Sequence, residues 1–126
     1  MRFDEVSTLR RRSEEFLQQA EASLRSGAYD AAAFLAEISL QLYLKSVLLE
    51  AVGDYPRTHS IRVLLSEISK HLGRKDIEDF VRANRARLIA LEDAYFTARY
   101  STSQFTQEDA EDAIKLAKEV LELVRK

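Results

Sequence analysis

The longest near-continuous apolar stretch of the chain covers residues 30–52, and its pattern predicts one helix of about six turns. At about 100° per residue, the apolar positions of this helix fall on two nearly opposite sides. They are Leu35, Ile38, Leu42 and Leu49 on one side, and Ala33, Ala36, Leu40, Leu44 and Val47 on the other. A helix that is apolar on two sides has to pack between neighbours, so we expect this helix at the centre of the fold.

Two narrow polar seams separate the apolar sides of this helix. One contains Glu37, Gln41 and Lys45, and the other contains Ser39, Ser46 and Glu50. A lysine in the middle of a largely buried helix needs water or an anion above its ammonium group. We therefore expect the first seam to form the floor of a cleft. We expect the second seam to be free for water or a second subunit.

Apolar stripes and capping residues predict a helix on each side of the central one. The preceding helix covers residues 3–26 and ends at Gly27, a residue suited to the left-handed conformation that follows many helices. The following helix is short, with Thr58 as its N-cap, and Gly73 ends it. The turn at Gly27 is so short that the first two helices should form an antiparallel hairpin.

The C-terminal half of the chain predicts two more helices. The first begins near Lys75 and continues unbroken through Asn84, with Arg99 extending its inward stripe. Residues 101–105 break the pattern and are predicted to form a loop. Thr106, with an acidic residue three positions later, has the pattern of a capping box at the start of the last helix.

Five helices, four long and one short, favour an all-α fold. We expect a single domain over residues 1–126, built as an up-and-down four-helix bundle with one additional short helix. No segment shows the alternation of a β-strand.

Composition narrows the range of functions. The net charge is −2, which gives no general electrostatic case for binding nucleic acid or an anionic membrane. The arginines at positions 82, 85 and 87 point in different directions around their helix, so they predict no basic strip. The central helix is interrupted by polar residues, which argues against a membrane span. Without cysteine or a signal-peptide pattern, the chain is expected to be soluble and cytoplasmic.

Motifs that would make a self-sufficient enzyme are missing from the sequence. The two histidines, His59 and His71, do not have the spacing of paired metal ligands. The sequence has no glycine-rich phosphate loop, and its serines do not lie in a nucleophile motif. The sequence therefore predicts neither a metal nor a cofactor.

Three cationic or titratable side chains occupy positions that are unusual for residues with a purely structural role. Lys45 lies on the central helix, His59 near a helix start where free backbone amides bind anions, and Arg99 on an inward stripe. Each also has a structural explanation: a lysine that extends past apolar neighbours, a surface histidine, and an arginine that complements a helix dipole. If the three converge, the natural ligand is a phosphate or a nucleotide.

Three further residues are weaker candidates. Tyr95 and Tyr100 are explained more readily as core or edge aromatic side chains than as ligand contacts. Asn84 is expected to be a buried amide that bonds to backbone or to a partner chain.

Nearly the whole chain resembles the HEPN family of helical domains in the order of its motifs. The residues that carry this likeness are Gly27-Ala28-Tyr29-Asp30-Ala31-Ala32, Lys45, Pro56-Arg57-Thr58-His59-Ser60, Leu64-Leu65, Tyr95, Arg99-Tyr100 and Glu108-Asp109-Ala110. The resemblance implies a bundle of four to five helices that dimerises through helix faces. It also implies a partner, because family members are often encoded beside, or fused to, a minimal nucleotidyltransferase. There they resemble substrate-binding modules or one half of a toxin–antitoxin pair.

Other members of the family are metal-independent ribonucleases that use an arginine followed four to six residues later by a histidine. This sequence departs from that pattern, because no arginine lies at that distance before His59 or His71. The leading hypothesis is therefore a non-catalytic, homodimeric HEPN protein that binds a nucleotide or phosphorylated ligand and acts with a nucleotidyltransferase. The alternatives are a ribonuclease toxin that uses His59 and Arg99, and a purely structural interaction module.

Residues at positions that match the family motifs, together with their neighbours, form the expected ligand site. It consists of Lys45, Thr58, His59, Tyr95, Arg99 and Tyr100. Lys45 and Arg99 would neutralise phosphate charge, and His59 with the amides after Thr58 would add hydrogen bonds. A tyrosine would stack on a base or line the pocket.

Overall fold

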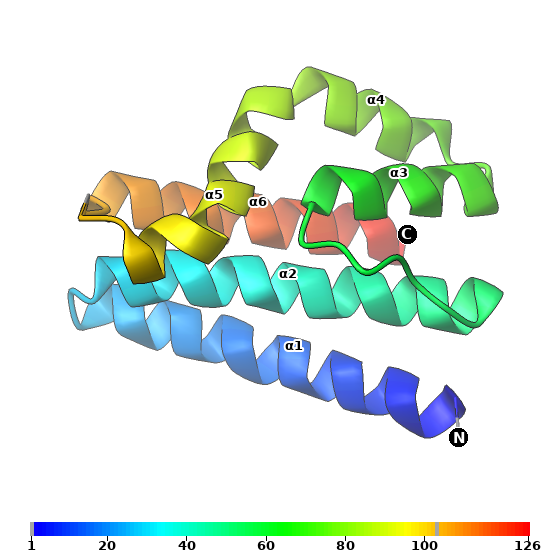
Figure 1. Cartoon of the computed structure of the whole chain (residues 1–126), viewed down its shortest axis with the longest axis horizontal. Coiled ribbons are helices and arrows are strands. Elements are labelled where there is room, and N and C mark those ends of the chain that lie inside the picture. Colours follow the sequence, from blue (N-terminus) through cyan, green and yellow to red (C-terminus); the bar gives the residue numbers. More distant parts are fainter. Residues whose placement is uncertain (1, 103) are drawn as a thin grey trace.

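The computed structural model describes residues 2–102 and 104–126, and in these residues it contains α-helices and no β-strand (Figure 1). The six helices are α1 (Arg2–Arg25), α2 (Tyr29–Val52), α3 (Ile61–Leu72), α4 (Lys75–Ala83), α5 (Arg85–Tyr100) and α6 (Gln107–Arg125). The prediction of an all-α fold is confirmed. The predicted number of helices is wrong, because six are present where five were expected.

The central helix α2 lies in the middle of the core. It contacts α1, α3, α5 and α6, and Figure 1 shows it between α1 on one side and the other helices on the opposite side. Ala36, Leu40 and Leu44 are fully buried in the main apolar cluster. The helix is therefore packed on two sides, as its pattern predicts. It runs antiparallel to α1 across Gly27, whose φ of 82° lies in the left-handed region.

The second polar seam of α2 is covered by α1, so the expectation that it is free for water or a second subunit is wrong. The hydroxyl of Ser13 donates to the carbonyl of Ser39, and the hydroxyl of Ser39 donates to the carbonyl of Ser13, each at 2.7 Å. Arg10 donates to Ser46 at 3.1 Å and pairs with Glu50 at 2.9 Å. A buried hydroxyl needs a hydrogen-bond partner, and α1 supplies one for Ser39 and one for Ser46.

The N-cap of α3 is Ser60, so the assignment of Thr58 as the cap is wrong. The Ser60 hydroxyl accepts from the amide of Val63 at 3.2 Å. The hydroxyl of Thr58 instead accepts a hydrogen bond from the backbone amide of Ser60, at 3.0 Å. Two hydroxyl residues stand two positions apart, and both have the same capping chemistry, so their order alone does not identify the cap. The capping box of α6 at Thr106 is confirmed.

The predicted long fourth helix is broken at Asn84 into α4 and α5. The side-chain amide of Asn84 donates to the carbonyl of Phe80 at 3.0 Å, and Arg87 donates to its side-chain oxygen at 3.2 Å. Asparagine competes in this way with helical hydrogen bonding. The break turns α4 away from the line of α5 and lays it over α3 (Figure 1).

The length and composition of α2 would allow it to cross a membrane, so its polar interruptions do not exclude a span as the sequence argument held. In the folded chain, 61% of the qualifying window is buried inside the protein. The core helix of a soluble protein can have the same length and apolar composition.

Candidate functional site

Gln41 lies at the centre of a polar network on the first seam of α2. Its side-chain nitrogen donates to both carboxyl oxygens of Glu37, at 2.7 Å for one of them. Its side-chain oxygen accepts from the ammonium of Lys45 at 3.5 Å and lies 3.3 Å from Nδ1 of His59. The spacing i, i+4, i+8 places the three α2 residues on one face, and His59 reaches them from the segment between α2 and α3.

Helix α5 completes the site with an aromatic ring and a guanidinium. The ring of Tyr95 stacks on His59, with centroids 4.0 Å apart and planes 23° from parallel. The guanidinium carbon of Arg99 lies 4.3 Å from the centroid of the same tyrosine and 5.1 Å from that of Phe34. Arg99 also donates through Nε to the carbonyl of Tyr95 at 2.7 Å. We name Glu37, Gln41, Lys45, His59, Tyr95 and Arg99 the α2–α5 cluster.

Burial dominates the charge state of Glu37. Its side chain is 0% exposed, and burial raises its pKa from 4.5 to about 8. The hydrogen bonds from Gln41 and the positive charges of Lys45 and Arg99 oppose this shift, whereas the negative charge of Glu92 adds to it. At neutral pH this carboxyl therefore holds its proton and does not cancel the cations of the cluster.

The same surroundings lower the pKa of both basic neighbours. Partial burial lowers the pKa of Lys45, an effect that Glu37 opposes and Arg57 reinforces. Burial, then the positive charges of Lys45 and Arg99, lower the pKa of His59. His59 is consequently neutral near pH 7, with a ring nitrogen that can accept a proton.

The structure brings together four of the six expected ligand residues: Lys45, His59, Tyr95 and Arg99. The hydroxyl of Thr58 accepts a hydrogen bond from the amide of Ser60, so this amide is already bonded within the chain. Tyr100 is 72% exposed and lies beside Arg99, with its ring centroid 4.7 Å from the guanidinium carbon. It flanks the cluster rather than stacking on His59.

The α2–α5 cluster joins buried side chains of α2 to exposed side chains of neighbouring segments. Gln41 is 3% exposed because His59 covers it, whereas His59 and Arg99 are themselves exposed. The structural explanation for Arg99 also has support, since its bond to the Tyr95 carbonyl satisfies the last turn of α5.

Sequence reasoning missed several neighbours of the cluster. Tyr55 lies beneath the Lys45 ammonium, with 5.6 Å between the nitrogen and the ring centroid, and Phe34 flanks Arg99. Glu92 pairs with Arg62 at 2.8 Å and also accepts from the backbone amide of Arg62. The spacing of positions 92, 95 and 99 puts Glu92 on the same helix face, so this residue could have been found from the sequence.

The chemistry of the cluster suits an anion beside an aromatic face. Lys45 and Arg99 carry positive charge, His59 offers a nitrogen, and Tyr95 offers a ring. Within the described ranges, no group of three histidine, aspartate or glutamate side chains is placed to hold a metal ion.

The comparisons with known proteins agree with this architecture. The family model described as the HEPN domain matches residues 6–126. The crystal structure of TT1696 from Thermus thermophilus is similar, with a TM-score of 0.76, 27% identity, and 95% of each chain covered. No curated protein matches. Because the family model spans almost the whole chain, the protein belongs to the HEPN domain family.

Proposed function

We propose that this chain is a non-catalytic HEPN protein that binds a nucleotide or another phosphorylated ligand at the α2–α5 cluster. The observation that supports the proposal most is the arrangement of Lys45 and Arg99 around one histidine–tyrosine stack. Lys45 donates to the same Gln41 oxygen that lies beside His59, and Arg99 lies over the Tyr95 ring that stacks on His59.

The geometry suggests a role for each side chain. Lys45 and Arg99 would neutralise phosphate oxygens, and Arg99 has a forked guanidinium suited to two of them. The exposed ring of Tyr100 would hold a base by stacking, because His59 and Arg99 already lie against the ring of Tyr95. The protonated Glu37 below would leave the positive charge of the site uncancelled.

Membership of the HEPN family supports the remaining part of the proposal. The chain would act as a homodimer in the cytoplasm with a separately encoded minimal nucleotidyltransferase. Mass spectrometry of proteins that copurify with the tagged chain tests this part, and recovery without any nucleotidyltransferase would count against it.

Lys45→Ala and Arg99→Ala should each weaken nucleotide binding at least about tenfold, because hydrogen bonds to charged groups are worth about 1.5–3 kcal/mol. The measurement is isothermal titration calorimetry with ATP, AMP and inorganic phosphate. Lys115→Ala on α6 is the matched control, since this lysine is exposed and lies outside the cluster. Unchanged affinity in both variants, or no binding of any of the three probes, would refute the proposal.

A second candidate function is RNA cleavage by the same residues. The observation in its favour is that His59 and Arg99 both contact the ring of Tyr95. A neutral His59 would remove the proton of a 2′-hydroxyl, and Arg99 would stabilise negative charge on the phosphate.

If the chain cleaves RNA, His59→Ala should reduce the rate at least about a hundredfold, the usual contribution of a general base. Cleavage of several purified RNAs is followed on denaturing gels, with His71→Ala as the control. The absence of cleavage by the unaltered protein would exclude this candidate.

A further inference from the structure

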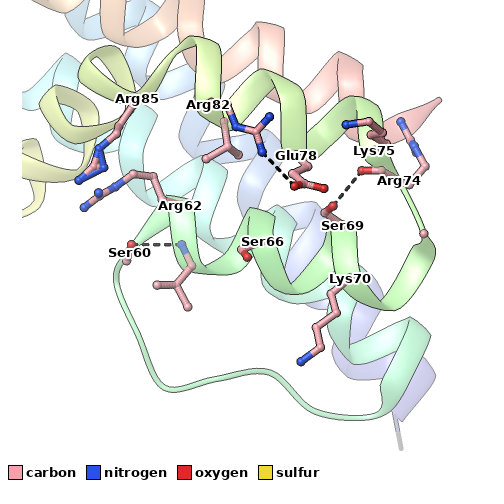
Figure 2. A pocket seen from close by; sticks show the side chains of 13 residues that line it. Ser60, Arg62, Ser66, Ser69, Lys70, Arg74, Lys75, Glu78, Arg82 and Arg85 are labelled. Atoms are coloured by element: carbon pink, nitrogen blue, oxygen red, sulfur yellow. Dashed lines mark hydrogen bonds and ion pairs between the residues drawn. The ribbon is translucent and has the colours of Figure 1, made fainter.

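A groove of about 870 Å³ lies between α3 and α4, outside the α2–α5 cluster (Figure 2). One side of the groove consists of one face of α3 and the turn after it, at positions 62/63, 66, 69/70 and 73. The facing side consists of α4, at positions 75, 78 and 82. The turn at Gly73 and Arg74 joins the two helices at one end of the groove. Arg62 and Arg85 lie together at the opposite end (Figure 2).

The lining of this groove is strongly basic in a chain whose net charge is −2. Its cationic residues are Arg62, Lys70, Arg74, Lys75, Arg82 and Arg85, and its acidic residue is Glu78. Four of the cations already have carboxylate partners within the chain. Lys70 and Arg85 have no hydrogen bond or ion pair with any residue that the structure describes. Positive charge is therefore left unmatched on α3, at Lys70, and at the start of α5, at Arg85.

The floor of the groove is apolar or small rather than polar. Val63 is 43% exposed, although it is a β-branched apolar residue on a helix, and Val81 is half-buried opposite it. Ser66 between them has a short side chain that leaves room for a second backbone to approach. An apolar floor with cationic rims is complementary to a helix that carries apolar residues on one face and carboxylates beside them.

We propose that the groove between α3 and α4 docks an acidic amphipathic helical segment of a partner protein. The apolar face of the segment packs on Val63 and Val81, and its carboxylates pair with Lys70 and Arg85. From position 62 to its end at position 72, α3 rises by about 15 Å, so the groove accommodates about three turns of the partner helix.

A protein segment fits this groove better than a nucleic acid does. The described lining contains no aromatic or histidine side chain on which a base could stack. Four cations are already neutralised, which reduces the number of phosphates the groove could bind. Exposed apolar surface such as that of Val63 gains nothing from a phosphate backbone but is stabilised by burial against leucine.

Fluorescence anisotropy with a labelled peptide of about 14 residues tests the proposal. The peptide carries leucines at i, i+3 and i+7 with glutamates on both sides. It is compared with the same peptide bearing glutamine in place of glutamate, and with a single-stranded oligouridylate. We expect the acidic peptide to bind saturably and at least about tenfold more tightly than either comparator, because two new ion pairs form only with the acidic peptide.

Two double variants separate the groove from general charge. Lys70→Glu with Arg85→Glu should weaken binding of the acidic peptide at least about tenfold. Arg12→Glu with Lys115→Glu changes the net charge equally at exposed positions outside the groove, and should leave affinity within about twofold. Ser66→Leu, which fills the floor, should also weaken binding. The proposal would be overturned by any of three results: no binding of the acidic peptide, equal effects of the two double variants, or tighter binding of the oligouridylate.

Discussion

Glu37→Gln is expected to remove most of the pH dependence of stability between about pH 4.5 and about pH 8. In the folded protein, burial holds the pKa of Glu37 at about 8, whereas the unfolded chain releases this proton near pH 4.5. Between these values the folded state binds more protons than the unfolded state. The free energy of unfolding therefore falls as the pH rises through this window.

The size of the effect follows from the pKa shift. One pKa unit corresponds to about 1.4 kcal/mol, so the loss of stability above pH 8 is on the order of 5 kcal/mol. Glutamine has the shape of the protonated carboxyl and does not ionise. The variant should match the unaltered protein below pH 4.5 and exceed it in stability above pH 8.

Urea unfolding at several pH values measures this difference. Glu122→Gln on α6 serves as the control, because that side chain is exposed and should not alter the curve. A constant offset between Glu37→Gln and the unaltered protein at every pH would show that Glu37 does not hold its proton in the folded state.

Glu92→Ala is expected to lower the free energy of unfolding by about 2 kcal/mol, since hydrogen bonds to charged groups are worth about 1.5–3 kcal/mol. The Glu92 side chain is only 12% exposed, and it binds both the guanidinium and the backbone amide of Arg62. It thereby joins α5 to the first turn of α3, where free amides favour a negative charge. Its removal would leave a partly buried guanidinium without a partner.

The matched control for this prediction is Glu21→Ala, which removes an ion pair with Lys118 at 2.8 Å. Both of those side chains are substantially exposed, so the loss should stay below about 1 kcal/mol. Equal losses in the two variants at pH 7 would contradict the role assigned to Glu92. Because the charge of Glu92 raises the pKa of Glu37, Glu92→Ala should also shift the pH dependence of stability to lower pH.

Local signals in the sequence predicted most helix ends correctly. Gly27 and Gly73 both have positive φ values where the pattern ends a helix, and Thr106 has both bonds of its capping box. These features are local because each depends on residues within one turn.

The errors had one local and one tertiary origin. Asn84 fits an inward helical stripe, yet its side-chain amide bonds to the carbonyl of Phe80, four positions earlier, and the helix breaks there. The second seam of α2 was predicted to be open, but Ser13 and Arg10 of α1 satisfy it. The pairings between α1 and α2 join residues 26 and 36 positions apart, which a helical period does not reveal.

The candidate site could be predicted only in part for the same reason. Lys45 and Arg99 were recognised because a cation on an inward stripe conflicts with burial. Their convergence depends on the path of the segment before α3, which carries His59 to Gln41. The groove between α3 and α4 was missed altogether, because an unbroken fourth helix would not have laid α4 over α3 or placed Arg85 beside Arg62.

The break at Asn84 also affects how firmly α4 is held. Of the nine residues of α4, which the structure describes in full, Ile77 alone is fully buried. A helix with so little buried surface is expected to open by local unfolding at a lower free energy than α2 or α6. Backbone amides of α4 should therefore exchange with deuterated solvent first among the helices of the core. A segment bound in the groove would slow this exchange, because it binds only the closed form.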